Sequence, residues 1–280
     1  MPRPARPSAS PLILLLAIAP IPALAGAWVR DAGGLYLSVG PSLFVGEPSA
    51  GGLDDSPAST FTGRAVEAYG EIGIGAGLEL DLSARWVANA QDLEDGTTRS
   101  VAGAGDIEAR LKWGPPVLLQ SGATVSFVAG ARVAPYPTLS FEDEASGEPP
   151  LGPGGADLLV GANVGTGLSV FPGWIDVGLL HRVRLNSPSA ALSLRGELGW
   201  RPWRPLALAL AAEVQPAYGR RLDGPEDAPM PVPTQASLGA KVLVELAGGV
   251  GLAVDFAWQP GALSDGAGYR AAAGVTWSTD

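Results

Sequence analysis

Charged side chains recur at alternate positions along much of this chain, opposite apolar ones. Carboxylates, guanidinium groups and amines on one face of a strand can pair across strands, or they can line a path whose field selects solutes. An isolated buried charge is costly, so in an enclosed space these groups must pair or stay hydrated. The sequence therefore predicts an internal charged surface with these pore-lining candidates: Glu67, Glu71, Glu79, Asp81, Arg85, Asp106, Glu108, Arg110, Lys112, Arg132, Arg182, Arg184, Arg195, Glu197, Lys241 and Glu245.

Basic residues of this set are concentrated late in the chain and acidic residues early. Arg132, Arg182, Arg184 and Arg195 could form a basic ladder that faces the acidic cluster within positions 64–113. A field between the two groups would orient polar solutes. Cross-strand ion pairs that stiffen the protein are the alternative, and the two roles are compatible.

The single histidine, His181, is the side chain that suggests catalysis. A Ser-His-Asp site of the kind found in outer-membrane phospholipases would need a serine on a neighbouring strand that faces the same side. His181 alternates with Leu179 and Val183 onto the apolar side, whereas Ser169 and Ser193 fall on the opposite side. The sequence predicts that the protein is not an enzyme.

Composition excludes several other kinds of site. The chain has no cysteine, so it has neither a disulfide framework nor a thiolate metal site. Its net charge of -10 leaves no basic face for nucleic acid. Acidic clusters in 51–56, 92–95, 141–148 and 223–227 predict solvated loops, with cation bridging to lipopolysaccharide as the alternative. We expect no cofactor and no resident metal.

The elements that position these side chains are strands, because apolar and polar residues alternate with period two. Most of the predicted strands are 10 to 15 residues long, and a tilted strand that crosses a membrane needs about 9–11. Twelve strands are predicted, at 34–45, 64–75, 78–89, 106–113, 123–135, 156–170, 175–186, 191–200, 206–218, 234–247, 250–259 and 268–277.

The connections between these strands alternate in length. Segments 46–63, 90–105, 136–155, 219–233 and 260–267 are long or polar, whereas 76–77, 171–174, 201–205 and 248–249 are tight. The connection 187–190 is short and 114–122 is intermediate, so these two depart from the pattern. Outer-membrane barrels have long loops outside the cell and short turns in the periplasm. We therefore predict one all-β, antiparallel, up-and-down transmembrane barrel.

The two faces of the predicted barrel differ in side-chain size and polarity. Small inward residues such as Gly161, Gly165, Gly167, Ala209, Ala211, Gly251 and Ala253 would leave part of the lumen open, or would instead relieve strand curvature. The outward set is apolar, with aromatic residues near strand ends that fit interfacial girdles. These are Trp86, Trp113, Trp174, Trp200, Trp203, Trp258, Tyr269 and Trp277.

The N-terminus has the pattern of a secretory signal. Arg3 and Arg6 precede an apolar stretch at 11–22, and Ala23-Leu24-Ala25 forms a cleavage motif. The apolar stretch is shorter than the roughly 20 residues of a membrane-spanning helix. We expect a signal peptide at 1–25 and a barrel at 26–280, located in a bacterial outer membrane.

One short motif carries a resemblance. Residues 101–113, with Gly103, Gly105, Asp106 and Lys112, resemble a signature of the outer-membrane transporters of the phenol-degradation meta-pathway (MetA-type) family. The resemblance implies a twelve-stranded barrel that passes small, often hydrophobic molecules. The chain differs from many such barrels at its C-terminus, where Ser278-Thr279-Asp280 follow the last aromatic residue.

Three functions remain open from the sequence. The first is a passive channel for small solutes, aromatic or hydrophobic ones included. The second is a structural or adhesion barrel plugged by its own ion pairs, and the third is a lipid-facing enzyme. The expected partners are outer-membrane lipid, lipopolysaccharide, the barrel-assembly machinery and small solutes, with no nucleic acid.

Overall fold

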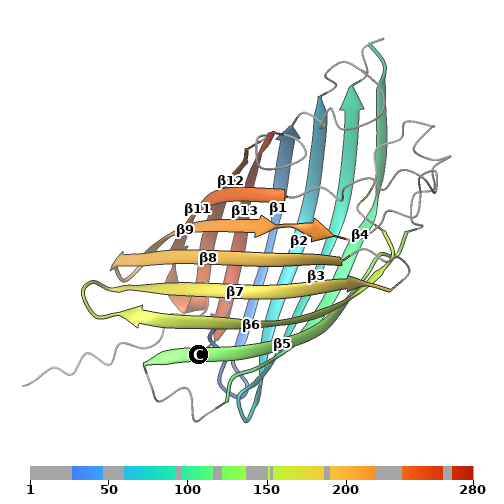
Figure 1. Cartoon of the computed structure of the whole chain (residues 1–280). Coiled ribbons are helices and arrows are strands. Elements are labelled where there is room, and N and C mark those ends of the chain that lie inside the picture. Colours follow the sequence, from blue (N-terminus) through green and yellow to red (C-terminus); the bar gives the residue numbers. More distant parts are fainter. Residues whose placement is uncertain are drawn as a thin grey trace, which may run out of the picture.

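The computed structural model describes residues 27–46, 60–92, 96–115, 122–136, 151, 154–185, 190–218, 235–260 and 267–279. Within them, no helix is both long and apolar enough to cross a membrane. Antiparallel strands form one sheet that closes on itself (Figure 1). The strands are β1 (Leu35–Gly46), β2 (Phe61–Gly75), β3 (Leu78–Asp92), β4 (Thr98–Trp113), β5 (Ala123–Val133), β6 (Ala156–Leu168), β7 (Gly173–Arg184), β8 (Ala190–Trp203), β9 (Leu206–Gln215), β10 (Ala217–Tyr218), β11 (Gln235–Glu245), β12 (Val250–Gln259) and β13 (Gly268–Thr279).

The barrel closes because β1 pairs with β13 and β9 pairs with both β8 and β11. The two-residue β10 pairs with β8, as β9 does. It follows β9 in the chain and is separated from it only by Pro216. Proline cannot donate a backbone hydrogen bond to the ladder, so it separates one strand into two segments. The described residues therefore form a closed barrel of twelve strands, which confirms the predicted fold class.

The predicted boundary of β4 is wrong. Much of 90–105, predicted as a loop, continues β3 to Asp92 and begins β4 at Thr98. The pairing register between β3 and β4 shifts opposite Arg85, where Gly105 and Asp106 follow one another without alternating. Both are buried against the interior, as expected of a β-bulge. A Cβ on Gly105 would lie 2.7 Å from Cγ of Arg85, which explains glycine at this position of the motif.

The outer surface of the barrel is apolar. Leu210 on β9 is 63% exposed, and outward valines, leucines and aromatic residues recur on most strands. This surface has the composition of a lipid-contacting band. The prediction for Trp174 is wrong, because this side chain is only 4% exposed and packs inside with Ala207, Ala209 and Leu243. It lies on the inward-facing set of β7, where its indole meets the interior of the barrel.

A matched pair of arginine substitutions tests this assignment of faces. Leu210→Arg places a cation on the apolar surface, and Ala211→Arg places one on the adjacent inward position. We expect Leu210→Arg to lower the free energy of unfolding in lipid vesicles by about 2–4 kcal/mol. Ala211→Arg should lower the free energy of unfolding much less, because position 211 lies opposite Glu197 in the β8–β9 pair. Equal losses in urea titrations of the two refolded variants would contradict the assignment.

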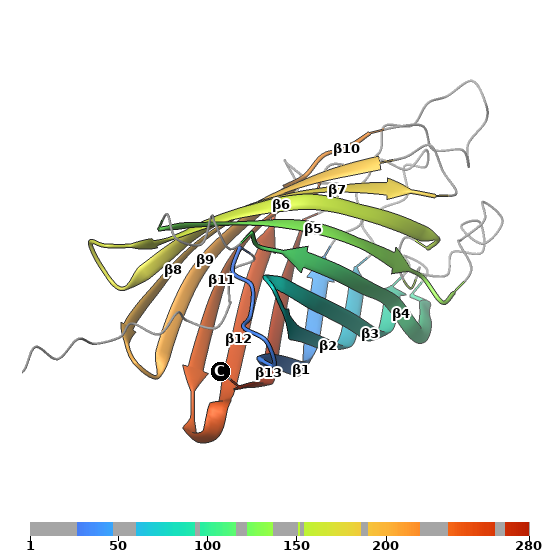
Figure 2. The ribbon, with the colours of Figure 1, turned by 90° about the horizontal axis from the view of Figure 1, so that it is seen from below.

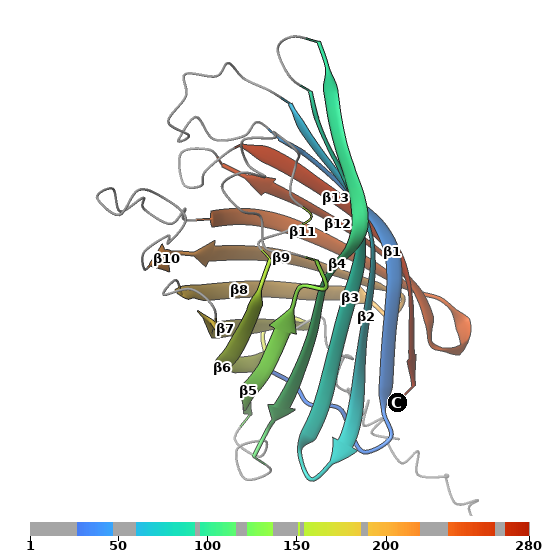
Figure 3. The same ribbon diagram turned by 90° about the vertical axis from the view of Figure 1, so that its right-hand side faces the viewer.

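The pairing around the barrel is uneven. β4 pairs with β5 only from Ile107 to Trp113, although β4 begins at Thr98. Strands β2 to β4 therefore extend past the loop-side ends of β5 to β8 (Figure 3). The stretch from Thr98 to Asp106 has no strand partner on its β5 side among the described residues.

Candidate functional site in the barrel lumen

The sixteen predicted pore-lining residues lie on inward-facing positions, and the structure groups most of them into networks. The first network, here called the arginine cluster, lies on β3 to β7. Its members are Arg85, Arg110, Arg132, Arg182 and Arg184 with Asp106, Glu108 and Asp157.

Asp157 and Asp106 are the centres of this cluster. The carboxylate of Asp157 pairs with Arg132, and its oxygens lie 3.4 Å from Nε of Arg184 and 3.7 Å from Nε of Arg182. Asp106 accepts hydrogen bonds from Arg85 at 2.6 Å and from Arg132 at 3.1 Å. The predicted basic ladder is thus partly wrong. Three of its arginines surround one aspartate, and they do not face the acidic cluster across the lumen.

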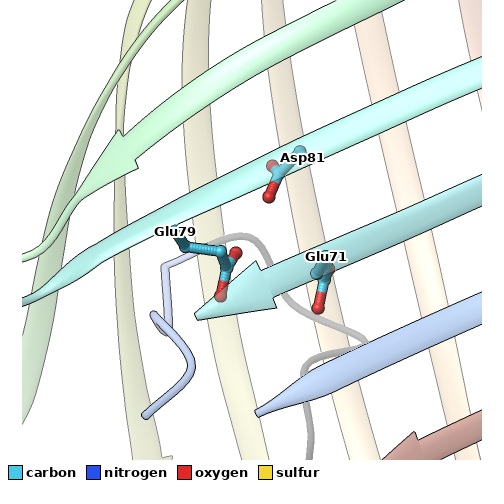
Figure 4. A group of neighbouring side chains, drawn as sticks. All are labelled: Glu71, Glu79 and Asp81. Carbon is cyan, nitrogen blue, oxygen red and sulfur yellow. The ribbon is translucent and has the colours of Figure 1, made fainter. Parts of the chain in front are cut away.

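A second network lies at the tight-turn end of β2, β3 and β4. The buried carboxylates of Glu71, Glu79 and Asp81 point into the same space (Figure 4). Lys112 pairs with Glu79 and lies 3.8 Å from Asp81. Nε of Arg30 donates a hydrogen bond of 2.7 Å to Glu71. The three carboxylates are close enough to ligate a cation, but Lys112 and Arg30 already supply the positive charge there.

The remaining predicted residues form smaller groups. Glu197 accepts hydrogen bonds from Arg195, from Lys241 and from the indole of Trp174. Glu67 pairs with Arg270, a lumen arginine outside the predicted pore-lining set. Asp157 and Asp176 are two further inward charges outside the predicted pore-lining set. Glu245 pairs with Arg201 where β8 and β11 approach the tight turns.

The most important feature that the sequence did not predict is the position of residues 27–33. This segment, here called the N-terminal plug, lies inside the ring of strands before the chain enters β1 (Figure 2). The backbone N–H of Ala27 donates a hydrogen bond to Asp176 on β7 at 2.8 Å. The backbone N–H of Arg30 donates to Glu79 on β3 at 2.6 Å. The segment thus crosses from one side of the barrel to the other.

The plug also packs against the barrel wall. Trp28 contacts the buried cluster of Trp174, Ala207, Ala209 and Leu243, and its carbonyl accepts a hydrogen bond from Lys112. A Cβ on Gly165 would lie 2.7 Å from the Trp28 ring. Part of the space that the small inward residues leave is therefore filled by the chain itself. No residue pattern in 27–33 is periodic, so sequence reasoning had no signal to place it.

Other parts of the lumen keep open space. A cavity of about 150 Å³ is lined by Glu67, Arg270 and several small residues. A second cavity of about 180 Å³ is lined by Glu213, Gln215 and Gln235. The small residues that line the first cavity are Gly40, Ala253, Ala272 and Gly274.

The geometry expected for a lipid-facing catalytic site is not formed by the predicted residues. The alternating burial of β7 places His181 on the outer face, between the exposed Leu179 and Val183. Ser193 faces inward and its hydroxyl donates a hydrogen bond of 2.7 Å to Glu213. Ser169 lies in the turn after β6. The histidine and Ser193 point to opposite faces of the sheet and cannot form a proton-transfer pair.

Known structures share this fold. The COG4313 outer membrane channel from Pseudomonas putida F1 is similar with a TM-score of 0.69 and 8% identity, over 92% of this chain and 100% of that chain. The translocator domain of the autotransporter NalP from Neisseria meningitidis has a TM-score of 0.53 and 11% identity, over 89% of each chain. The NanC porin has a TM-score of 0.50 and 6% identity, over 85% of this chain and 98% of that chain.

These identities are low, so the likeness is one of fold. This is the fold of bacterial outer-membrane barrels. No protein family model matches the sequence, and no curated protein matches it. The resemblance to the phenol-degradation family therefore stays a prediction.

Proposed function

We propose that this protein is an outer-membrane channel for small solutes, and that the N-terminal plug closes its periplasmic end. The observation that carries the proposal is a closed barrel with an apolar outside and a charged, partly open inside. Lumen-facing side chains such as those of Glu67 and Arg270 are about two-fifths exposed, so water reaches them. The likeness in fold to a solved outer membrane channel supports the same function.

We propose that the solutes are small molecules, including aromatic and hydrophobic ones. Small apolar side chains line part of the cavity of about 150 Å³, which suits molecules of this kind. Among the described residues, the stretch of β4 from Thr98 to Asp106 has no strand partner on β5, and we propose that such molecules enter the barrel at this side.

The proposal includes export and processing of the chain. Cleavage after Ala25 would leave a mature protein that begins directly before the N-terminal plug. The hydrogen bond from Ala27 to Asp176 supports this, because it holds the first described residue inside the lumen. Mass spectrometry of the protein from purified outer membranes tests both points. A mature mass that begins at Gly26 is expected, and an uncleaved protein in the inner membrane would overturn them.

Single-channel recording in planar bilayers tests the channel function. The wild-type protein should show rare openings, because the plug crosses the lumen, and a variant with a weakened plug should conduct steadily. Before recording, the heat-dependent migration of each protein on gels is used to confirm that the barrel has refolded. Absence of current from both proteins, with the barrel intact, would refute the channel and favour the alternative below.

The second candidate function is a structural barrel that never opens. The specific observation in its favour is that the plug contacts several strands and that its backbone donates hydrogen bonds to the buried carboxylates of Asp176 and Glu79. The two candidates differ in whether weakening the plug produces current, so the same recordings decide between them.

A further inference from the structure

The arginine cluster has a surplus of positive charge. Five arginines meet three carboxylates in it, and all eight side chains belong to β3 to β7. The pairing register places Glu108 beside Arg132, Arg132 beside Asp157, and Asp157 beside Arg184. Because these side chains lie next to one another, the surplus of positive charge is confined to this part of the lumen, although the net charge of the whole chain is negative.

The cluster is also layered. The carboxylates of Asp106, Glu108 and Asp157 are at most 12% exposed and lie against the wall. Four of the arginines are 25–39% exposed, whereas Arg132 lies buried beneath them. A solute in the lumen therefore meets guanidinium groups first, and the acids that partly neutralise them lie behind.

Two of these arginines are loosely held. Nε of Arg182 lies 3.7 Å from the nearest oxygen of Asp157 and has no hydrogen-bond partner among the described residues. Nε of Arg184 lies at 3.4 Å, beyond the usual length of a charged hydrogen bond. A planar guanidinium group that is not fully engaged can bind a carboxylate through two parallel hydrogen bonds.

From this layering and loose pairing, we propose that the arginine cluster is an anion-selecting site that binds the carboxylate of small organic acids as they pass. The inference rests on the proposed channel function and names its substrate class. Arg182 and Arg184 are the residues that contact the anion, and Asp157 positions them.

Ion selectivity provides the first test. Reversal potentials are measured across a tenfold KCl gradient, for the wild type and for a variant with a weakened plug, Arg30→Glu. We expect chloride to be preferred over potassium. One charge about 5 Å from the path in water changes the concentration of each ion about fourfold, in opposite directions for chloride and potassium, so Arg182→Gln should lower the permeability ratio about sixteenfold. Arg182→Lys should preserve it, and Arg64→Ala, which removes an outward-facing cation, is the matched control.

Binding provides a second test that does not depend on current. Benzoate is titrated into the refolded protein in detergent and the heat is measured, with benzyl alcohol as the uncharged control. Benzoate should bind the wild type and not Arg182→Gln, with weakened binding to Arg182→Lys because the two-pronged geometry is lost. Benzyl alcohol should not bind at this site.

The outcomes separate the inference from the channel proposal. Current without anion preference, or with a preference that Arg182→Gln leaves unchanged, overturns the inference and leaves the channel intact. Absence of current in every variant refutes the channel. In that case benzoate binding lost in Arg182→Gln still supports the site, and absence of binding to the wild type overturns it.

Discussion

Arg30→Glu is expected to raise the open probability of single channels by about two orders of magnitude. Arg30 holds the N-terminal plug through the buried ion pair with Glu71, in which the two side chains are 7% and 5% exposed. Breaking a buried pair costs about 3–5 kcal/mol, and glutamate at this position would also repel Glu71 and Glu79. The plug should then leave the lumen, while the strand ladders of the barrel remain.

The reversed pair supplies the control. Arg30→Glu combined with Glu71→Arg restores opposite charges at the same place, so the channel should close again. Arg30→Lys keeps the charge and should open the channel much less than Arg30→Glu. If Arg30→Glu folds but conducts like the wild type, the plug does not control the pore.

Asp157→Asn is expected to lower the free energy of unfolding by about 3–5 kcal/mol, because it leaves buried cations without their counter-charge. Asp157 is fully buried and contacts Arg132, Arg182 and Arg184. Asparagine keeps the size of the side chain, so the loss reports charge and not volume. Urea unfolding in phospholipid vesicles, followed by tryptophan fluorescence, measures it.

Glu67→Gln is the matched control for this substitution. Glu67 also pairs with a lumen arginine, Arg270, but their side chains are 39% and 42% exposed. A solvated pair contributes at most about 1 kcal/mol, so this variant should unfold close to the wild type. A similar loss in the two variants would mean that the charge of Asp157 stabilises the barrel no more than a solvated pair does.

Some features of the lumen can be predicted from the sequence and others cannot. The inward position of Asp157 and Arg182 followed from strict alternation, because each strand residue can face only one of two sides. Their partnership did not follow, since it depends on which residues of β6 and β7 lie side by side. Register is a property of paired strands, and a single strand carries little information about it. The bulge at Gly105 and Asp106 shows the same limit, because it breaks the alternation within one strand.

The class of fold follows from local features of the chain alone. Period-two alternation, long strands and the alternation of loops with tight turns are local properties, and together they require a closed sheet with unlike faces. The occupant of the lumen, in contrast, is set by contacts between distant parts of the folded chain. Residues 27–33 have no periodicity, and their place depends on Asp176, Glu79 and Glu71, which are distant in sequence. These contacts form only once the barrel brings β2, β3 and β7 around one interior.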